Sequence, residues 1–237
     1  MEPGSPRISL SDYDAAVFET LGLAADDPPP LSQLVPLYLE LSSRHHSRPN
    51  EATGGSLQTP APSPLESLVR LLIFARRTFF AARALQGLLP DLPVVEHGAG
   101  YAPALLALHP RGAHAAVEEF THYRSVRQQL FHAFGIEPPS SPTRWRAEEA
   151  VPPLLHVYAH ALFEMSDGNV DSAVGAVSTL LKPEDTCLIL EPGDQSHAHF
   201  LQAFRDRWVG SERSHDIVAP CPPLSGCSLG TKPREWC

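Results

Sequence analysis

The sequence is poor in the features that mark membrane-spanning and nucleic-acid-binding proteins. It has no run of about 18 or more uncharged apolar residues, so we expect no transmembrane span. The most apolar stretch, residues 69–89, is interrupted by Arg70, Arg76, Arg77 and Arg83. Positive charge is scarce, because 18 Lys and Arg stand against 27 Asp and Glu and give a formal net charge of −9. This balance argues against bulk attraction to RNA or DNA, and we expect no DNA partner.

Cysteine is also scarce, and its placement is uneven. Three of the four cysteines, Cys221, Cys227 and Cys237, lie in the last 17 residues. The first residues show neither the apolar core of a signal peptide nor the Arg-rich pattern of a transit peptide. We therefore expect a cytoplasmic location, or the mitochondrial matrix if the chain is eukaryotic. In such compartments clustered cysteines indicate a metal site or an iron–sulfur cluster more than disulfides.

The 237 residues are enough for one medium domain plus an appendage, and a hydrophobic content of 43% allows a full core. The pattern predicts three parts. Residues 1–62 hold two helices, at 11–23 and 35–43, and then a linker rich in Pro, Ser and Gly. Residues 63–219 form the main domain, and residues 220–237 form a cysteine-containing tail.

Local signals mark where these helices begin. Ser11 can cap the first helix, and Pro36 suits the first turn of the second. Ser63, Pro64 and Glu66 form a capping box with proline at the first helical position. This third helix is predicted to continue to about Leu89 and to deliver the chain to the stretch that organises the main domain.

That stretch is residues 92–103, which reads as a short buried strand, a glycine turn and a helix. Val94 and Val95 suit a packed strand, whereas Gly98 and Gly100 permit a sharp turn and the close approach of a ligand to the backbone. Such a turn favours a nucleotide-binding fold, although Pro103 replaces the third glycine of the dinucleotide pattern and argues against NAD. The alternative is a structural turn without a ligand.

The residues that follow alternate between strands and helices in the pattern of a parallel, doubly wound α/β fold. We predict strands at 113–118, 143–146, 154–159 and 186–193, and helices at 121–134, 171–181 and 198–209. The first of these strands ends in Glu118 and Glu119. A carboxylate at this place holds the ribose hydroxyls of a nucleotide, and Glu118 suits the role because it follows the apolar run directly. The alternative for Glu118 is an exposed acid at the start of a loop.

Three segments together carry a resemblance to a known family. Glu96-x-Gly98-x-Gly100 resembles motif I of class I S-adenosylmethionine-dependent methyltransferases, with Ala102 in place of a third glycine. Residues 188–193 read Leu-Ile-Leu-Glu-Pro-Gly, and residues 219–237 contain Ala-Pro-Cys-Pro and a final Trp-Cys. With these segments in this order, residues 65–237 resemble the small-ribosomal-subunit methyltransferase-like family of bacteria and mitochondria.

The resemblance implies a Rossmann-like class I methyltransferase fold with an N-terminal helical extension. It implies that S-adenosylmethionine is the cofactor and that four residues bind it: Glu96, Gly98, Gly100 and Glu118. It further implies a four-iron–four-sulfur cluster on Cys221, Cys227 and Cys237, and the small ribosomal subunit or its rRNA as the partner. Soft thiolates suit such a cluster, which needs four ligands.

Departures from the family pattern leave several alternatives open. The tail has three cysteines rather than four, and the last strands of a methyltransferase sheet are missing, so we expect a truncated or degenerate member or one that a partner completes. A zinc site and no metal at all are alternatives to the cluster. Val151 stands where amino-group methyltransferases have Asp or Asn, so the catalytic residues and the methyl acceptor are not assigned. His156 and His160 are interpreted as structural residues more readily than as bases.

The sequence therefore supports three hypotheses on function. The first is a methyltransferase that acts on rRNA or another substrate. The second is a non-catalytic assembly or interaction protein that keeps the methyltransferase fold. The third is a small-molecule methyltransferase with the N-terminal helices as a lid.

Overall fold

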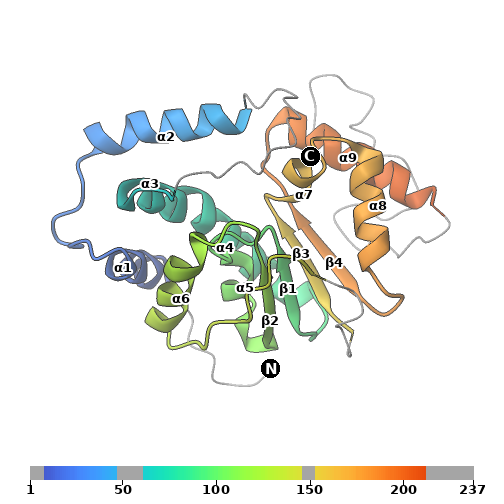
Figure 1. Ribbon diagram of the computed structural model, residues 1–237, viewed down its shortest axis with the longest axis horizontal. Helices are drawn as coiled ribbons and strands as arrows, with labels where there is room; N and C mark the ends of the chain where they lie inside the picture. Colours follow the sequence, from blue (N-terminus) through green and yellow to red (C-terminus); the bar gives the residue numbers. More distant parts are fainter. Residues whose placement is uncertain (1–7, 47–60, 146–152, 212–237) are drawn as a thin grey trace.

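A computed structural model of the chain describes residues 8–46, 61–145 and 153–211, and Figure 1 shows their arrangement. At its centre lies a sheet of four parallel strands in the order β2-β1-β3-β4. The strands are β1 (Val94–His97), β2 (Ala113–Val117), β3 (Leu155–Ala159) and β4 (Thr186–Leu190). The fold is thus α/β with an all-parallel sheet, which is compatible with a Rossmann-like architecture. All four carboxyl ends meet at one edge, and the strand order reverses between β1 and β3.

The short strand predicted at residues 143–146 is wrong for the part that the structure describes, because residues 143–145 are not in a strand. The chain instead contacts β2 slightly earlier. Ala116 N donates to Ser140 O at 2.9 Å and Glu118 N donates to Pro142 O at 3.1 Å. Pro139 and Pro142 have no backbone N–H, so a regular ladder cannot form here and only an isolated bridge between Ala115 and Ser140 remains.

Helices cover both faces of the sheet, as the alternating side chains of the strands require (Figure 1). Val94 joins a large apolar cluster on one face, whereas Val95 joins a cluster on the other. The first face carries α1 (Leu10–Thr20), α4 (Arg76–Leu85), α5 (Pro103–Ala107) and α6 (Tyr123–Ala133). The second carries α7 (Leu162–Met165), α8 (Val170–Leu180) and α9 (Gln195–Val209). Among the described residues, no helix is both long and apolar enough to cross a membrane.

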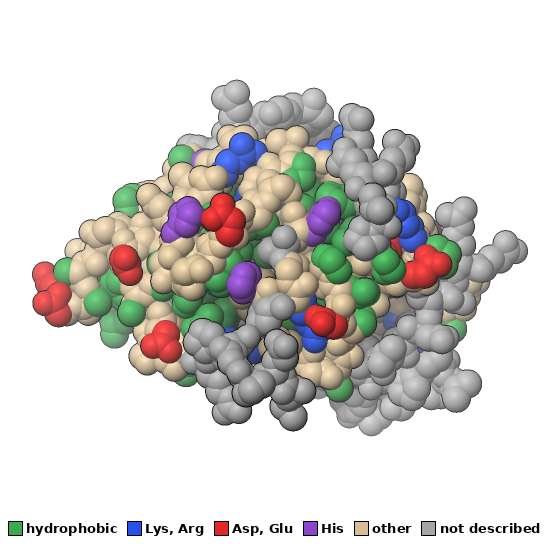
Figure 2. Space-filling model, turned by 90° about the horizontal axis from the view of Figure 1, so that it is seen from below, with side chains coloured by type: hydrophobic (Ala, Val, Ile, Leu, Met, Phe, Trp, Pro, Cys, Tyr) green, Lys and Arg blue, Asp and Glu red, His purple; other side chains and the backbone are tan. Residues whose placement is uncertain are grey.

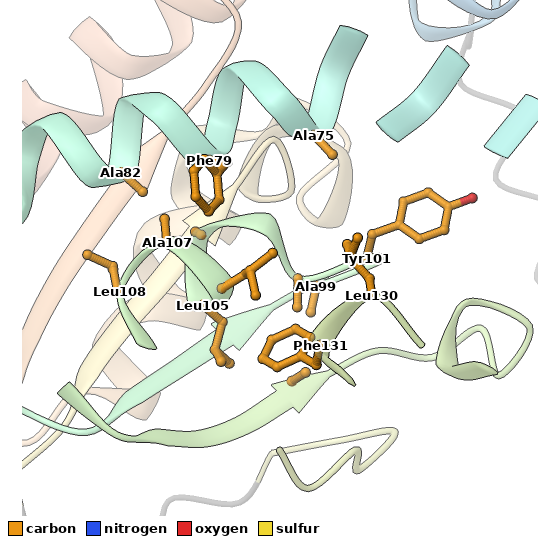
Figure 3. Packing of buried hydrophobic residues seen from close by; sticks show 14 of the residues in the cluster. Ala75, Phe79, Ala82, Ala99, Tyr101, Leu105, Ala107, Leu108, Leu130 and Phe131 are labelled. Atoms are coloured by element: carbon orange, nitrogen blue, oxygen red, sulfur yellow. The ribbon is translucent and has the colours of Figure 1, made fainter. Parts of the chain in front are cut away.

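The core of the first face lies between α4 and the sheet. Figure 3 shows Phe79 of α4 together with Leu105 of α5 and Phe131 of α6, and all three are fully buried. Burying one such side chain stabilises a fold by roughly 1.5–3 kcal/mol. Dense packing here fixes α5 and, with it, the glycine turn that precedes α5.

Helix α1 belongs to the same core. Tyr13 and Val17 are fully buried, and the Tyr13 hydroxyl donates to Leu71 O at 3.3 Å. The predicted cap at Ser11 is wrong. Ser9 caps the helix instead, because its Oγ accepts from Asp12 N and the Asp12 carboxylate accepts from Ser9 N in a capping box.

Helix α2 spans Leu31–His46, so it begins before the predicted start at residue 35 and holds Pro36 in its interior. The capping box at Ser63 is confirmed, with Pro64 in the first turn of α3 (Pro64–Val69). A π-helical segment η1 (Arg70–Ala75) joins α3 to α4, and the 3-10 helix η2 (Gln86–Leu88) follows α4. The helical region predicted from residue 63 to about residue 89 is therefore confirmed, with a π-helical insertion. A further 3-10 helix, η3 (His109–Arg111), precedes β2.

Candidate functional site

Unusual backbone geometry gathers at the carboxyl edge of the sheet, where β1 and β3 end. Gly98 and Gly100 have φ values of +60° and +48°, and Ala102 has +55° although it carries a Cβ. His160 follows β3 directly and has a φ of +57°. Left-handed backbone costs a non-glycine residue roughly 1–2 kcal/mol, and such residues cluster at functional sites. The edge at the reversal of strand order is therefore the candidate site.

The glycine turn and the end of β2 meet through Glu118. Gly100 N donates to Glu118 Oε2 at 2.7 Å, and Phe120 N donates to Glu118 Oε1 at 2.8 Å. The carboxylate is half-buried. Because each carboxylate oxygen can accept more than one hydrogen bond, both oxygens keep capacity for a ligand donor. The structure thus brings together Gly100 and Glu118, two predicted site residues that lie 18 positions apart in the sequence.

Glu96 has a different position from Glu118. Its side chain is 1% exposed and turns toward α5, where it accepts from Leu105 N at 2.7 Å and from Ala104 N at 3.4 Å. It thereby satisfies two N–H groups that the first turn of a helix leaves without partners. Burial raises the pKa of Glu96 to about 8, although these N–H groups act in the opposite direction. Glu96 therefore holds the turn from inside.

The two glycines of the turn have different surroundings. A Cβ on Gly98 would lie 2.7 Å from the Cβ of Ala161, so this glycine allows the turn to pack against the segment after β3. A Cβ on Gly100 would meet no atom within 4 Å. The space that the sequence assigned to a ligand at both glycines is occupied by Ala161 at Gly98, and it is open at Gly100.

Sequence reasoning missed Arg127, which holds the outer side of the turn. This α6 residue is 2% exposed, and its guanidinium donates to Gly100 O at 2.7 Å and to Ser141 Oγ at 2.8 Å. Burial lowers the pKa of Arg127, whereas the nearby Glu118 and Glu96 raise it. An arginine on the same helical face as the buried Leu130 and Phe131 was the signal that could have revealed it.

A second polar group lies beneath the turn, on the other face of the sheet. His97, His156 and Asp185 are 2%, 1% and 5% exposed. His97 Nε2 lies 3.0 Å from His156 Nδ1, and His156 Nε2 lies 3.4 Å from Asp185 Oδ2, longer than an ordinary hydrogen bond. Since a carboxylate only accepts, we assign the proton of His156 to Nε2 and that of His97 also to Nε2. This buried chain joins β1 and β3 to the segment before β4.

Burial keeps the imidazoles of His97 and His156 neutral. It lowers the pKa of His156, and it lowers the pKa of His97 to about 3 with a further contribution from His156. Tyr158 stacks on His97 with ring centroids 4.6 Å apart. The interpretation of His156 as a structural residue therefore agrees with its place in the core.

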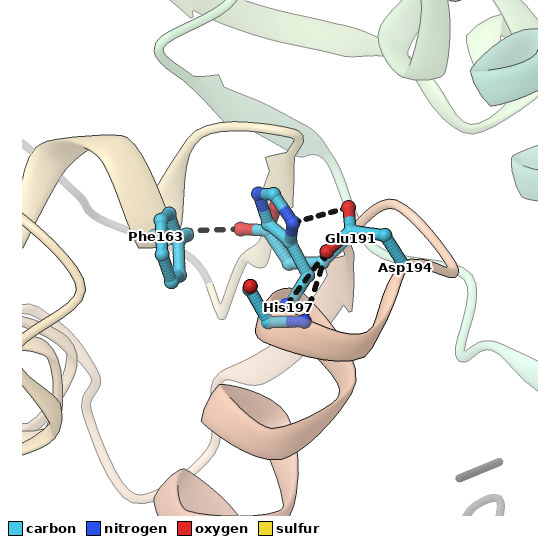
Figure 4. Close-up of polar contacts among 5 residues, drawn as sticks. Phe163, Glu191, Asp194 and His197 are labelled. Atoms are coloured by element: carbon cyan, nitrogen blue, oxygen red, sulfur yellow. Dashed lines mark hydrogen bonds and ion pairs between the residues drawn. The ribbon is translucent and has the colours of Figure 1, made fainter. Parts of the chain in front are cut away.

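The carboxyl end of β4 carries a further polar group, shown in Figure 4. Glu191 Oε1 accepts from Phe163 N at 3.0 Å, and burial raises the pKa of Glu191 to about 7. Asp194 caps α9, and its Oδ2 lies 2.5 Å from His197 Nδ1. The ring of Phe163 packs on His197 with centroids 4.3 Å apart. The sequence indicated the turn at Glu191 but not the Asp194–His197 pair.

Two sequence predictions concern the cysteine tail and the surface charge. Cys221, Cys227 and Cys237 lie outside the described residues. Within the described ranges no group of three or more His, Cys, Asp and Glu side chains is placed to hold a metal ion, and Cys187 lies inside β4. On the face shown in Figure 2, the Lys and Arg side chains of the described residues are scattered among acidic and apolar ones.

Comparisons of the chain with protein-family models, with curated proteins and with solved structures gave no match. Function is therefore inferred from the residues of the carboxyl edge.

Proposed function

We propose that the chain binds S-adenosylmethionine at the carboxyl edge of its sheet and is a methyltransferase, or a methyltransferase-like factor, linked to the small ribosomal subunit or its rRNA. The observation that carries the cofactor part of this proposal is the meeting of the Glu118 carboxylate with the Gly100 backbone at 2.7 Å. The ribosomal part rests on the resemblance of residues 65–237 to the small-ribosomal-subunit methyltransferase-like family. An acid at the end of β2 beside a glycine turn after β1 is the arrangement that holds a ribose in doubly wound folds.

The residues present fit such a cofactor. Glu118 offers oxygens that can accept from the paired ribose hydroxyls, and the side of Gly100 that a Cβ would occupy is open. Glu96 and Arg127 hold the turn from its two sides, so its shape is set before a ligand arrives. When bound, the cofactor supplies an activated methyl group, and the protein contributes mainly by positioning the two reactants.

One observation favours the second hypothesis, a non-catalytic assembly factor. Both oxygens of Glu118 already accept from the chain's own backbone, at Gly100 and Phe120. A carboxylate used in this way also serves as a loop clamp without any ligand. The two hypotheses differ in whether the folded chain binds the cofactor at all.

Calorimetric titration of the full chain with S-adenosylmethionine and S-adenosylhomocysteine tests the proposal. We expect binding that weakens about ten- to hundredfold in Glu118→Ala, because hydrogen bonds to a charged group contribute roughly 1.5–3 kcal/mol. Glu119→Ala, an exposed neighbour, is the matched control and should bind as the parent does. Thermal unfolding of each variant separates lost binding from lost folding. A folded parent that releases no heat with either compound rejects the proposal and favours the scaffold.

A further inference from the structure

The carboxyl edge has two halves. The proposed cofactor contacts use β1 and β2, through Gly100 and Glu118. The other half, at the ends of β3 and β4, carries His160, Glu191 and the pair Asp194 and His197. If the cofactor occupies the first half, the second half is left for the molecule that receives the methyl group.

The Asp194–His197 pair has the geometry of an oriented base. Asp194 Oδ1 accepts from Ser196 N at 3.0 Å and from His197 N at 3.2 Å, which fixes the carboxylate. Its Oδ2 lies 2.5 Å from His197 Nδ1, and Phe163 packs against the imidazole. Since the carboxylate accepts, Nδ1 carries the proton and Nε2 keeps its lone pair. No described residue forms a hydrogen bond with Nε2, and the side chain is 11% exposed.

The Asp194 carboxylate carries its negative charge, and further acidic groups lie on this half of the edge. Glu191 lies near both Asp194 and Glu164, whose negative charges add to burial in raising the pKa of Glu191. Hydrogen bonds from the backbone and from His197 outweigh burial and lower the pKa of Asp194, so this carboxylate stays ionised beside the imidazole.

We propose that His197 is a catalytic residue that accepts the proton of the methyl acceptor, with Asp194 as its positioning residue, and that the acceptor is therefore an amine or a hydroxyl. This inference rests on the proposed function. The acceptor's nitrogen or oxygen forms a bond to the methyl carbon as the carbon–sulfur bond breaks, and that electron pair remains on sulfur. The proton of the N–H or O–H group moves to His197 Nε2 and is later released to water.

The test uses the full chain with ¹⁵N-labelled histidine, observed by NMR at pH 8. In the parent we expect His197 to carry its proton on Nδ1. In Asp194→Asn, the side-chain amide can donate to Nδ1, so the proton should move to Nε2, while the asparagine still caps α9. Adding S-adenosylmethionine and S-adenosylhomocysteine in turn should give different His197 signals, because only the first carries a positive sulfonium. His199, exposed on the same helix, is the matched control and should not distinguish them.

Calorimetry on the same proteins separates the two ideas. We expect His197→Gln and Asp194→Asn to bind S-adenosylmethionine within about twofold of the parent, whereas Glu118→Ala loses affinity. If the parent binds neither compound, the proposed function falls and the role of His197 falls with it. If the parent binds both but His197 carries its proton on Nε2, or its signals are the same in the two complexes, the base assignment is overturned and the cofactor site stands.

Discussion

Replacing Asp185 with alanine should destabilise the protein strongly, because its carboxylate is a buried hydrogen-bond acceptor. The Asp185 carboxylate accepts from Leu154 N and from Lys182 N, each at 2.8 Å, and faces His156 Nε2 at 3.4 Å. Its side chain is 1% exposed. Alanine removes the acceptor of both backbone N–H groups and the carboxylate that faces His156 Nε2.

The size of the effect follows from which donors can reach water. Leu154 is fully buried and His156 is 1% exposed, so neither donor finds a substitute, whereas Lys182 is only half-buried. Each buried donor left without a partner costs roughly 1–3 kcal/mol. Removing a buried carboxylate also removes its own desolvation cost, so we expect a net loss of about 3 kcal/mol. This is a large part of the roughly 5–15 kcal/mol that stabilises a typical domain.

Urea unfolding followed by circular dichroism measures this change. For a slope of about 2 kcal/mol per molar urea, the midpoint should fall by about 1.5 M. Glu184→Ala, an exposed neighbour on the same loop, is the matched control and should stay within about 0.5 kcal/mol of the parent. Asp185→Asn keeps an oxygen for Leu154 N and should lose less than the alanine variant. A loss below about 1 kcal/mol in Asp185→Ala would refute the role of Asp185 as a buried hydrogen-bond acceptor.

Two further predictions follow from the same structure, and a third follows from the cysteine tail of the sequence. His97 protonates near pH 6.5 in the unfolded chain but only near pH 3 in the folded chain. The free energy of unfolding of the parent should therefore fall, relative to that of His97→Gln, by about 1.4 kcal/mol for each unit that the pH drops between 6.5 and 3. Parallel curves of stability against pH for the two proteins would contradict this. Gly98→Ala should lower the free energy of unfolding by about 2–3 kcal/mol, because the alanine is strained in a left-handed conformation and collides with Ala161. Adding Ala161→Gly to this variant should restore part of the loss. Equal losses in the single Gly98→Ala variant and in the double variant would argue against the collision. Cys221→Ser should remove iron and visible absorption from anaerobically purified protein; a parent without iron or zinc would reject the metal site.

Much of the fold could be predicted because its signals are local. The valines before Gly98, the capping box at Ser63 and the alternation of strands and helices all lie within short windows, and the sheet is parallel as expected. The meeting of Gly100 and Glu118 could also be predicted, because parallel strands bring their carboxyl ends to one edge.

The cap of α1 was predicted wrongly because two serines fit the local pattern equally well. Ser9 and Ser11 are each followed three residues later by an aspartate, at Asp12 and Asp14, so both fit a capping box. Asp14 instead forms an ion pair with Arg76 of α4 at 3.1 Å, a contact with no local signal. Tertiary packing therefore decides in favour of Ser9.

The polar residues that shape the site were harder to predict. Arg127 reaches the glycine turn from α6, and the chain of His97, His156 and Asp185 joins three segments that are distant in sequence. Sequence patterns give the face on which a residue lies, but not its partner on another element. Glu96 illustrates the same limit, because its position suited a ligand while its side chain turns to the first turn of α5.

A crystal structure of the chain grown with S-adenosylhomocysteine would test cofactor binding at Glu118 and Gly100 most directly. We expect the ribose hydroxyls to donate to the Glu118 carboxylate, which accepts from Gly100 N in the free chain, and the homocysteine part to lie along the open side of Gly100. Ligand density at another surface would contradict the proposed cofactor site. So would a crystal grown at saturating ligand concentration in which Glu118 keeps its contacts to Gly100 and Phe120 with no ligand beside it.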